Sequence, residues 1–144
     1  MKTELKATVL TALTGALLLT ACGEAGTPQE RAESAFERLT EACANQQGDY
    51  SGAEGLVLYT GSDADRKYKD FASAEGQERQ MLNSACYQIS SMMRGGDGYT
   101  VSGYETETES EGAWHVLEVS FDSGESAQVA FLDVDGRMGL GDID

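Results

Sequence analysis

Basic residues are scarce in this chain. It has 10 lysines and arginines against 25 aspartates and glutamates, so its formal net charge is −15 at pH 7. So large an excess of negative charge repels nucleic-acid phosphates and anionic lipid head groups, which argues against nucleic-acid binding. The acidity indicates a strongly solvated surface, with the capture of cations or of a basic partner as the functional alternative.

Motifs that hold metals or activate nucleophiles are also missing. The sequence contains neither a Gly-x-Ser-x-Gly elbow nor a His-Glu-x-x-His pair, and its one histidine is His115. The segment 133–136 (Asp-Val-Asp-Gly) has its glycine directly after the second aspartate, whereas a calcium loop of the EF-hand type needs two more residues there. We interpret this segment as a hairpin turn and expect neither a metal nor a cofactor.

A long apolar run is absent, but a short one stands near the N-terminus. Residues 7–20 are almost entirely apolar and follow Lys2 and Lys6. As a helix they would reach about 21 Å, short of the roughly 30 Å hydrocarbon layer of a membrane. A cleaved signal peptide fits this length better than a permanent membrane helix.

The apolar run ends at Leu19-Thr20-Ala21-Cys22, which resembles the lipobox of bacterial lipoproteins. The resemblance implies that Cys22 carries acyl chains such as palmitate and becomes the mature N-terminus. The alternative is an ordinary secretory peptide with an incidental cysteine. We expect a signal peptide over 1–21, a lipidated tether over 22–26 and a domain over 27–144.

A signal peptide with a lipobox implies that lipid anchors the domain in a membrane of the bacterial cell envelope, on the extracytoplasmic side. In a Gram-negative cell we expect the outer membrane, because Gly23 follows the lipidated cysteine in place of the aspartate that retains some lipoproteins at the inner membrane.

Two cysteines remain in the mature chain, Cys43 and Cys86. Each lies on an apolar stripe of helical spacing: Ala32, Ala35, Phe36, Leu39 and Cys43 in the first, and Leu82, Cys86, Ile89 and Met93 in the second. Both thiols should point inward, and the compartment outside the cytoplasm, to which the protein would be exported, permits their oxidation to a disulfide. We predict a disulfide between them, with two free buried thiols as the alternative.

The order of secondary structure predicts an α+β domain. A capping box formed by Thr27 and Glu30, with Pro28 at the first helical position, begins a helix. The expected helices span about 27–47, 63–71 and 75–94, and residues 56–59 are too short an apolar piece to assign. The expected strands span about 99–108, 113–121, 125–134 and 138–143, with turns at 122–124 and 135–136. Three helices packed on one side of an antiparallel meander make an α+β fold.

The core of this domain should lie between the sheet and the helices. Its expected members on the strands are Trp114, Val116, Leu117, Val119, Phe121, Ala127, Val129 and Phe131. Phe36 shares the apolar stripe of the first helix, so we expect that helix to cross the sheet with Phe36 packed against it.

The domain resembles the NTF2-like, or cystatin-like, bacterial lipoproteins of unknown function. The resemblance rests on a capped helix, the turn Gly48-Asp49, the segment 65–70 (Asp-Arg-Lys-Tyr-Lys-Asp), and a Trp114-bearing meander that ends in Leu-Gly-Asp-Ile-Asp at 140–144. It covers nearly the whole domain and implies a curved sheet wrapped around a long helix, a cone with a pocket at its open end. Ligand binders, scaffolding subunits and a few isomerases and dehydratases share this cone, so the fold does not select a function.

His115 is the candidate catalytic residue. It shares strand parity with Leu117, so it can face into the cone, where Tyr50, Tyr59 or Asp70 could approach it. The alternative is a partly exposed structural histidine at a strand start. An enclosed pocket with an acid within hydrogen-bond distance of His115 would favour catalysis.

Two charged clusters have both a binding and a structural interpretation. Glu105, Glu107, Glu109 and Glu111 share strand parity and form either a stripe for cations or a basic partner, or a solvated strand end. The basic cluster at 66–69 (Arg-Lys-Tyr-Lys) could recognise a phosphate or carboxylate, or could form a salt-bridged helix face.

These observations lead to two functional hypotheses. The first is a lipid-anchored, non-catalytic domain that binds a small apolar ligand or an envelope protein. The second is a cone-cavity enzyme of the isomerase or dehydratase type that uses His115 with a carboxylate or a tyrosine.

Overall fold

The computed structural model describes residues 25–44, 50–60, 68–71, 75–94 and 98–144. The elements in chain order are α1 (Pro28–Cys43), the short 3-10 helix η1 (Ser51–Ala53), β1 (Leu58–Thr60), β2 (Tyr68–Phe71), α2 (Gly76–Met92), β3 (Tyr99–Glu109), β4 (Gly112–Phe121), β5 (Ser126–Val134) and β6 (Arg137–Ile143). The signal peptide and Cys22 lie outside the described residues. Among the described residues, no helix is long and apolar enough to cross a membrane.

The four long strands form one antiparallel sheet in the order β3-β4-β5-β6. The turn between β5 and β6 places Asp135 and Gly136 at φ angles of 52° and 80°, the left-handed pair that a two-residue hairpin requires. In the turn between β4 and β5, Gly124 takes a φ of 92° and its N–H donates to the carbonyl of Phe121 at 2.9 Å. The predicted meander is confirmed in its strands and in these two turns.

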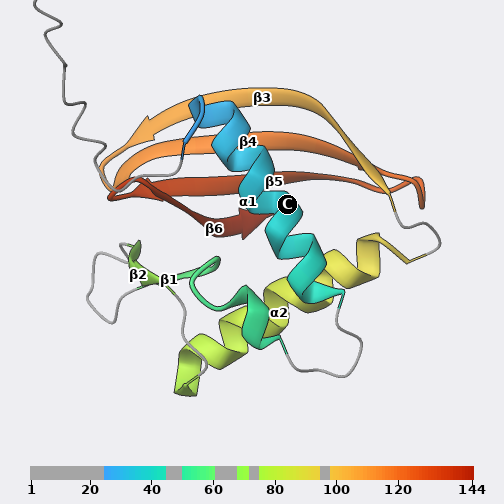
Figure 1. The fold of residues 1–144 in the computed structure, drawn as a ribbon, viewed down its shortest axis with the longest axis horizontal. Coiled ribbons are helices and arrows are strands. Elements are labelled where there is room, and N and C mark those ends of the chain that lie inside the picture. Colours follow the sequence, from blue (N-terminus) through green and yellow to red (C-terminus); the bar gives the residue numbers. More distant parts are fainter. Residues whose placement is uncertain (1–24, 45–49, 61–67, 72–74, 95–97) are drawn as a thin grey trace, which may run out of the picture.

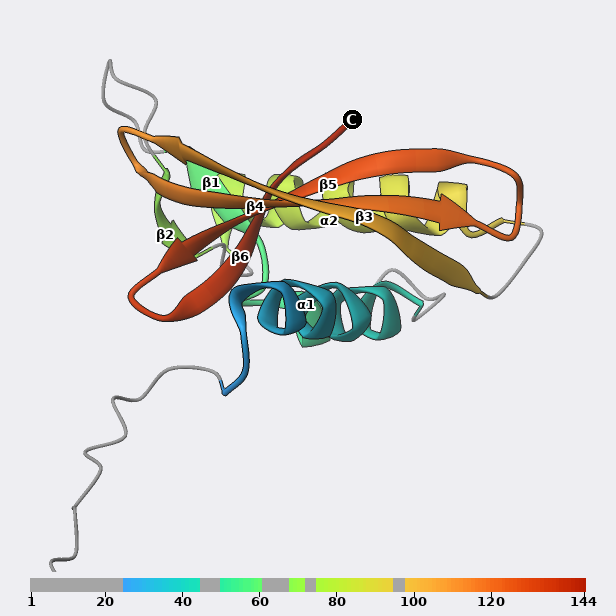
Figure 2. The same ribbon diagram turned by 90° about the horizontal axis from the view of Figure 1, so that it is seen from above.

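The two helices pack on this meander at different places (Figure 1, Figure 2). α1 crosses one face of the sheet, which we call the inner face, and α2 lies beyond β6 (Figure 1, Figure 2). The α+β expectation is therefore confirmed. The strongly curved cone that the resemblance implies is not observed, because the sheet is neither closed nor strongly curled and β3 and β6 remain separate edges.

The first helix begins as its capping box predicts. The Thr27 N–H donates to the Glu30 carboxylate at 2.8 Å, and the Glu30 N–H donates to the Thr27 hydroxyl at 3.2 Å. The helix ends at Cys43, with Ala44 as its C-cap, and not near Gln47 as predicted. The last three residues of the predicted span, 45–47, lie outside the described residues.

The predicted disulfide joins α1 to α2. The Cα atoms of Cys43 and Cys86 lie 4.8 Å apart across the bond, and both residues are buried. The prediction is confirmed, and the alternative of two free thiols is wrong for this structure. Because the bond joins the last residue of one helix to the middle of the other, it holds the two helices together beneath the sheet.

The main core lies between α1, α2 and the inner face. The ring of Phe36 meets Tyr99 edge-on at a centroid distance of 4.8 Å and Phe121 at 6.4 Å, so the predicted docking of the first helix is confirmed. The largest fully buried members include Phe36, Leu39, Ile89, Leu117, Val119, Val129, Phe131 and Met138.

Two predicted core residues point the other way. Trp114 and Val116 alternate with His115 and Leu117 along β4, so they face the opposite side of the sheet from α1. Trp114 packs there with Leu58 and Leu132 in a second, smaller cluster. The prediction that they belong to the core between sheet and helices is wrong. It followed their apolar character, whereas the alternation of side chains along β4 places them on the other face.

The segment before α2 also differs from prediction. Residues 68–71 form β2, which pairs antiparallel with β1, and not the end of a helix. The unassigned segment 56–59 contributes Leu58 and Tyr59 to β1. Helix propensity is a weak local preference, and the antiparallel pairing of residues 68–71 with β1 overrides it here. Residues 61–67 lie outside the described residues, and the described residues hold two α-helices in place of the predicted three.

Candidate functional site

The outer face of the sheet, which is turned away from α1, is built from alternate residues of each strand. Glu105 and Glu107 of β3 stand opposite Val116 and Trp114 of β4, and Val116 stands in turn opposite Ala130 of β5. Residues in register on antiparallel strands share a face. The glutamate stripe therefore borders apolar residues, and no described helix covers β3 or β4 on this side (Figure 1, Figure 2).

An open hollow of about 370 Å³ occupies this face, and we call it the outer-face hollow. Its ten lining residues are six acids, Glu105, Glu107, Glu109, Glu111, Asp142 and Asp144, together with Trp114, Val116, Gln128 and Ala130. None of these ten described residues is basic. Neighbouring hollows of about 390 Å³ and 210 Å³ share lining residues with it, the first Gln128 and Asp144, the second Asp142. The first of these adjoins the outer-face hollow at β5 and the C-terminal residue, whereas the second lies between α2, β1 and β6 and meets it only at Asp142.

Trp114, part of the apolar floor of the outer-face hollow, is fixed by packing and by a hydrogen bond. Trp114 is only 8 % exposed, packs with Leu58 and Leu132, and donates its indole N–H to Glu111 Oε1 at 3.3 Å. An indole fixed by packing and by a hydrogen bond offers a rigid surface that loses little conformational entropy when a partner covers it.

Sequence reasoning found the glutamate stripe but missed the opposite rim. Asp142 stands opposite Ala130, and Asp144 exchanges two backbone hydrogen bonds with Gln128, of 2.7 and 2.9 Å. Strand parity within β6 is the sequence pattern that could have placed these aspartates on the outer face. The register shift between Ala130 and Phe131 interrupts that parity, because it changes which residues of β6 face outward.

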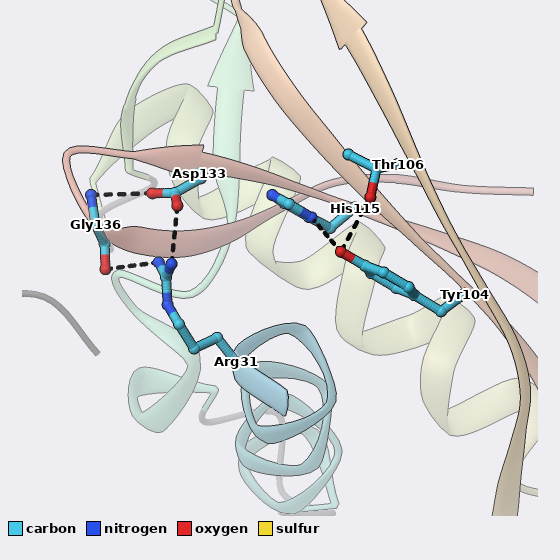
Figure 3. A network of polar contacts seen from close by, with 6 residues as sticks. All are labelled: Arg31, Tyr104, Thr106, His115, Asp133 and Gly136. Carbon is cyan, nitrogen blue, oxygen red and sulfur yellow. Dashed lines mark hydrogen bonds and ion pairs between the residues drawn. The ribbon is translucent and has the colours of Figure 1, made fainter. Parts of the chain in front are cut away.

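His115 lies on the inner face, the side of β4 that its parity predicts, and is 4 % exposed. Its Nδ1 lies 2.9 Å from the phenolic oxygen of Tyr104, and the two rings stack. The hydroxyl of Thr106 lies within hydrogen-bond distance of the same oxygen, at 3.0 Å (Figure 3). Tyr104 therefore bridges Thr106 and His115 on the inner face.

An ion pair between α1 and β5 stands on the other side of the imidazole ring (Figure 3). Arg31 Nη1 lies 3.0 Å from Asp133 Oδ2, and Nη2 donates to the carbonyl of Gly136 at 2.9 Å. The Gly136 N–H donates to Asp133 Oδ1 at 2.9 Å. Burial lowers the pKa of His115 from its ordinary value of 6.5; the charge of Asp133 opposes this shift and that of Arg31 adds to it. This cluster therefore favours an uncharged His115.

The surroundings of His115 resemble a structural cluster more than a catalytic pair. The expected neighbours were Tyr50, Tyr59 or Asp70, but the hydrogen bond goes to Tyr104 on the adjacent strand. Strand parity could have predicted this partner. The expectation of partial exposure was also wrong. The Asp133 carboxylate, which a catalytic base would use as its orienting acid, is already bound by Arg31 and by the turn.

Two other predicted sites lie wholly or partly outside the described residues. Cys22, the predicted lipidation site, lies outside the described residues, as do Arg66 and Lys67 of the basic cluster. Within the described ranges, no group of three or more histidines, cysteines and acids is placed to hold a metal ion.

Comparison with known proteins identifies no relative. No protein-family model matches the chain, and no curated protein or solved structure is significantly similar to it. The findings define an α+β protein with two helices on a four-strand antiparallel meander, and function has to be argued from the site itself.

Proposed function

We propose that this protein is a lipid-anchored protein of the bacterial envelope whose domain binds a basic partner protein, without catalysis, on the outer face of its sheet. The supporting observation is the outer-face hollow, where six acids surround an apolar floor. Lysines and arginines of a partner can pair with the acidic rim while its apolar groups cover the floor. Charge complementarity of this kind speeds encounter and selects among partners.

A small apolar ligand, the other candidate from the sequence, has less support. The space between α1 and the inner face is filled by side chains such as Phe36, Leu39 and Phe131, all 0 % exposed. The outer-face hollow is rimmed by carboxylates, and an apolar ligand would remove water from them without offering a hydrogen bond or a charge in return. A basic partner offsets that cost.

Two features support an envelope location. The Cys43–Cys86 disulfide is typical of proteins that fold outside the reducing cytoplasm. The lipobox ending at Cys22 supplies the anchor in our proposal, and α1 begins at Pro28. The intervening residues 23–27 span at most about 18 Å when fully extended, so the domain would stay close to the membrane surface.

A distant relation to the NTF2-like proteins is also part of the proposal. Its support is the order of elements: a capped helix, a second helix and a meander with Trp114 on its second strand. The open sheet is the departure from that family, and it moves the proposed binding surface from a cone interior to the outer face.

Site-specific photocrosslinking in cells of the native host tests the proposed function. A photoreactive amino acid would replace exposed Gln128 or Glu118 on the outer face, with exposed Glu37 of α1 and Asn83 of α2 as matched control positions. We expect a discrete adduct from the outer-face positions only. The adduct should weaken when Glu105, Glu107 and Glu109 are changed together to glutamine. Equal adducts from all positions, or adducts from the helices alone, would contradict the proposal.

A further inference from the structure

The two edges of the sheet differ in how they are covered. Beyond β6, the Leu140 N–H donates to the Leu56 carbonyl at 2.7 Å, and Val57 forms a parallel bridge with Leu140. β3 pairs only with β4 in the described sheet. β3 is therefore the open edge, and a strand at an open edge can pair with another extended chain.

The open edge has one regular stretch. The register of β3 with β4 shifts between Val101 and Gly103 and then runs without interruption from Gly103 to Glu109. Residues 105–109 are all exposed. In this stretch the glutamates alternate with Thr106 and Thr108, so Glu105, Glu107 and Glu109 recur along the outer face at about 6.8 Å intervals.

We infer that an extended segment of the partner adds to β3 as a fifth strand, with a lysine or arginine at every second position facing Glu105, Glu107 and Glu109. This inference rests on the proposed function and names its partner. Residues directly opposite on paired strands lie about 4.5–5.5 Å apart, so a basic residue at each alternate position meets one glutamate. Backbone hydrogen bonds provide affinity in such strand addition, and the alternate side chains provide specificity.

A second copy of this chain does not fit the edge. Pairing β3 with β3 would place glutamates beside glutamates, and like charges directly opposite destabilise a strand pair. Acidic residues on an edge strand thus exclude self-pairing and leave the edge open to a segment of opposite charge.

Two labelled peptides test the inference with the full, lipidated chain in detergent micelles. One alternates lysine and threonine over seven residues, and the other holds the same residues in a lysine block followed by a threonine block. We expect the alternating peptide to bind about tenfold more tightly by fluorescence anisotropy. It should also slow backbone hydrogen exchange of residues 103–109, as a newly paired strand must.

Matched variants assign the binding to the edge. Glu105→Gln, Glu107→Gln and Glu109→Gln together should weaken the alternating peptide about tenfold. The control, Glu33→Gln, Glu37→Gln and Glu41→Gln on α1, removes the same charge and should change the affinity less than about twofold.

Three outcomes overturn the inference. If both peptides bind equally and exchange at 103–109 is unchanged, charge alone holds the partner and the proposed outer-face function stands without strand addition. If the α1 control weakens binding as much as the β3 variant, the site is not the edge. If neither peptide binds, the strand-addition inference fails, and the crosslinking experiment decides the proposed function separately.

Discussion

Truncation of Phe36 to alanine should show how much of the fold depends on the docking of α1. Phe36 is 0 % exposed and meets two aromatic rings of the sheet, Tyr99 on β3 and Phe121 on β4. The side chain therefore connects the helix to an edge strand and to a central strand at once. Its removal leaves a cavity between the helix and these two strands.

The expected loss is about 3–5 kcal/mol. Phenylalanine-to-alanine changes in cores cost this much, as lost transfer energy plus the cavity left behind. Each edge-on aromatic contact adds about 0.5–1.5 kcal/mol beyond burial, which places Phe36 in the upper part of that range. Domains of this size are stable by about 5–15 kcal/mol, so the variant should remain folded at low temperature but unfold at much lower urea.

Urea unfolding of the oxidised protein, followed by fluorescence of Trp114, measures this loss. The matched control is Tyr87→Ala on α2, because Tyr87 is 66 % exposed and its truncation should cost less than about 0.5 kcal/mol. A loss below about 1 kcal/mol for Phe36→Ala, or equal losses for both variants, would mean that α1 does not dock through Phe36.

Three further predictions test the disulfide, the buried histidine and the anchor. Reducing the Cys43–Cys86 bond, with a sequence separation of 43, should cost about 4 kcal/mol of unfolding free energy in the chain-entropy model; two titratable thiols in the unfolded, unreduced protein would contradict the bond. Because burial lowers the pKa of His115, the unfolded chain binds more protons, so stability should be full above about pH 6.5 and decrease as the pH falls through the lowered pKa. His115→Gln should flatten that part of a urea-unfolding profile, and an unchanged profile would assign the dependence elsewhere. Cys22→Ala should block lipidation and processing, and a variant that still matures and partitions into a detergent-rich phase would refute the lipobox assignment.

The sheet was predictable because its local signals agree with one another. Period-two alternation, the Asp135-Gly136 turn and Gly124 all favour the same hairpins. The segment 63–71 was predicted as a helix from its local pattern alone, whereas residues 68–71 pair with the separate strand β1. This pairing depends on a contact between two segments that are separate in the sequence, so the local pattern of either segment does not predict it.

The candidate site was predictable in part for the same reason. The glutamates of β3 lie on one strand, so parity alone places them on one face. Asp142 and Asp144 join them only through β5, across a register shift. For His115, strand parity predicted the correct face of the sheet. Its hydrogen-bond partner Tyr104 follows only from the β3–β4 pairing, whereas the partner was expected to come from the segments before the sheet.

The distribution of acids separates edge protection from binding. Glu105, Glu107 and Glu109 lie on an open edge, where charge prevents self-pairing, and that role alone would account for them. It does not account for Asp142 and Asp144, which lie on the opposite rim of the same hollow, at the end of β6 and just after it. Six acids around one floor repel one another, and this repulsion opposes folding. Since the main core and the disulfide lie on the other side of the sheet, the outer-face acids add little to the packing of the fold. The proposed basic partner would neutralise both rims and so account for their joint placement, whereas edge protection accounts for only one rim.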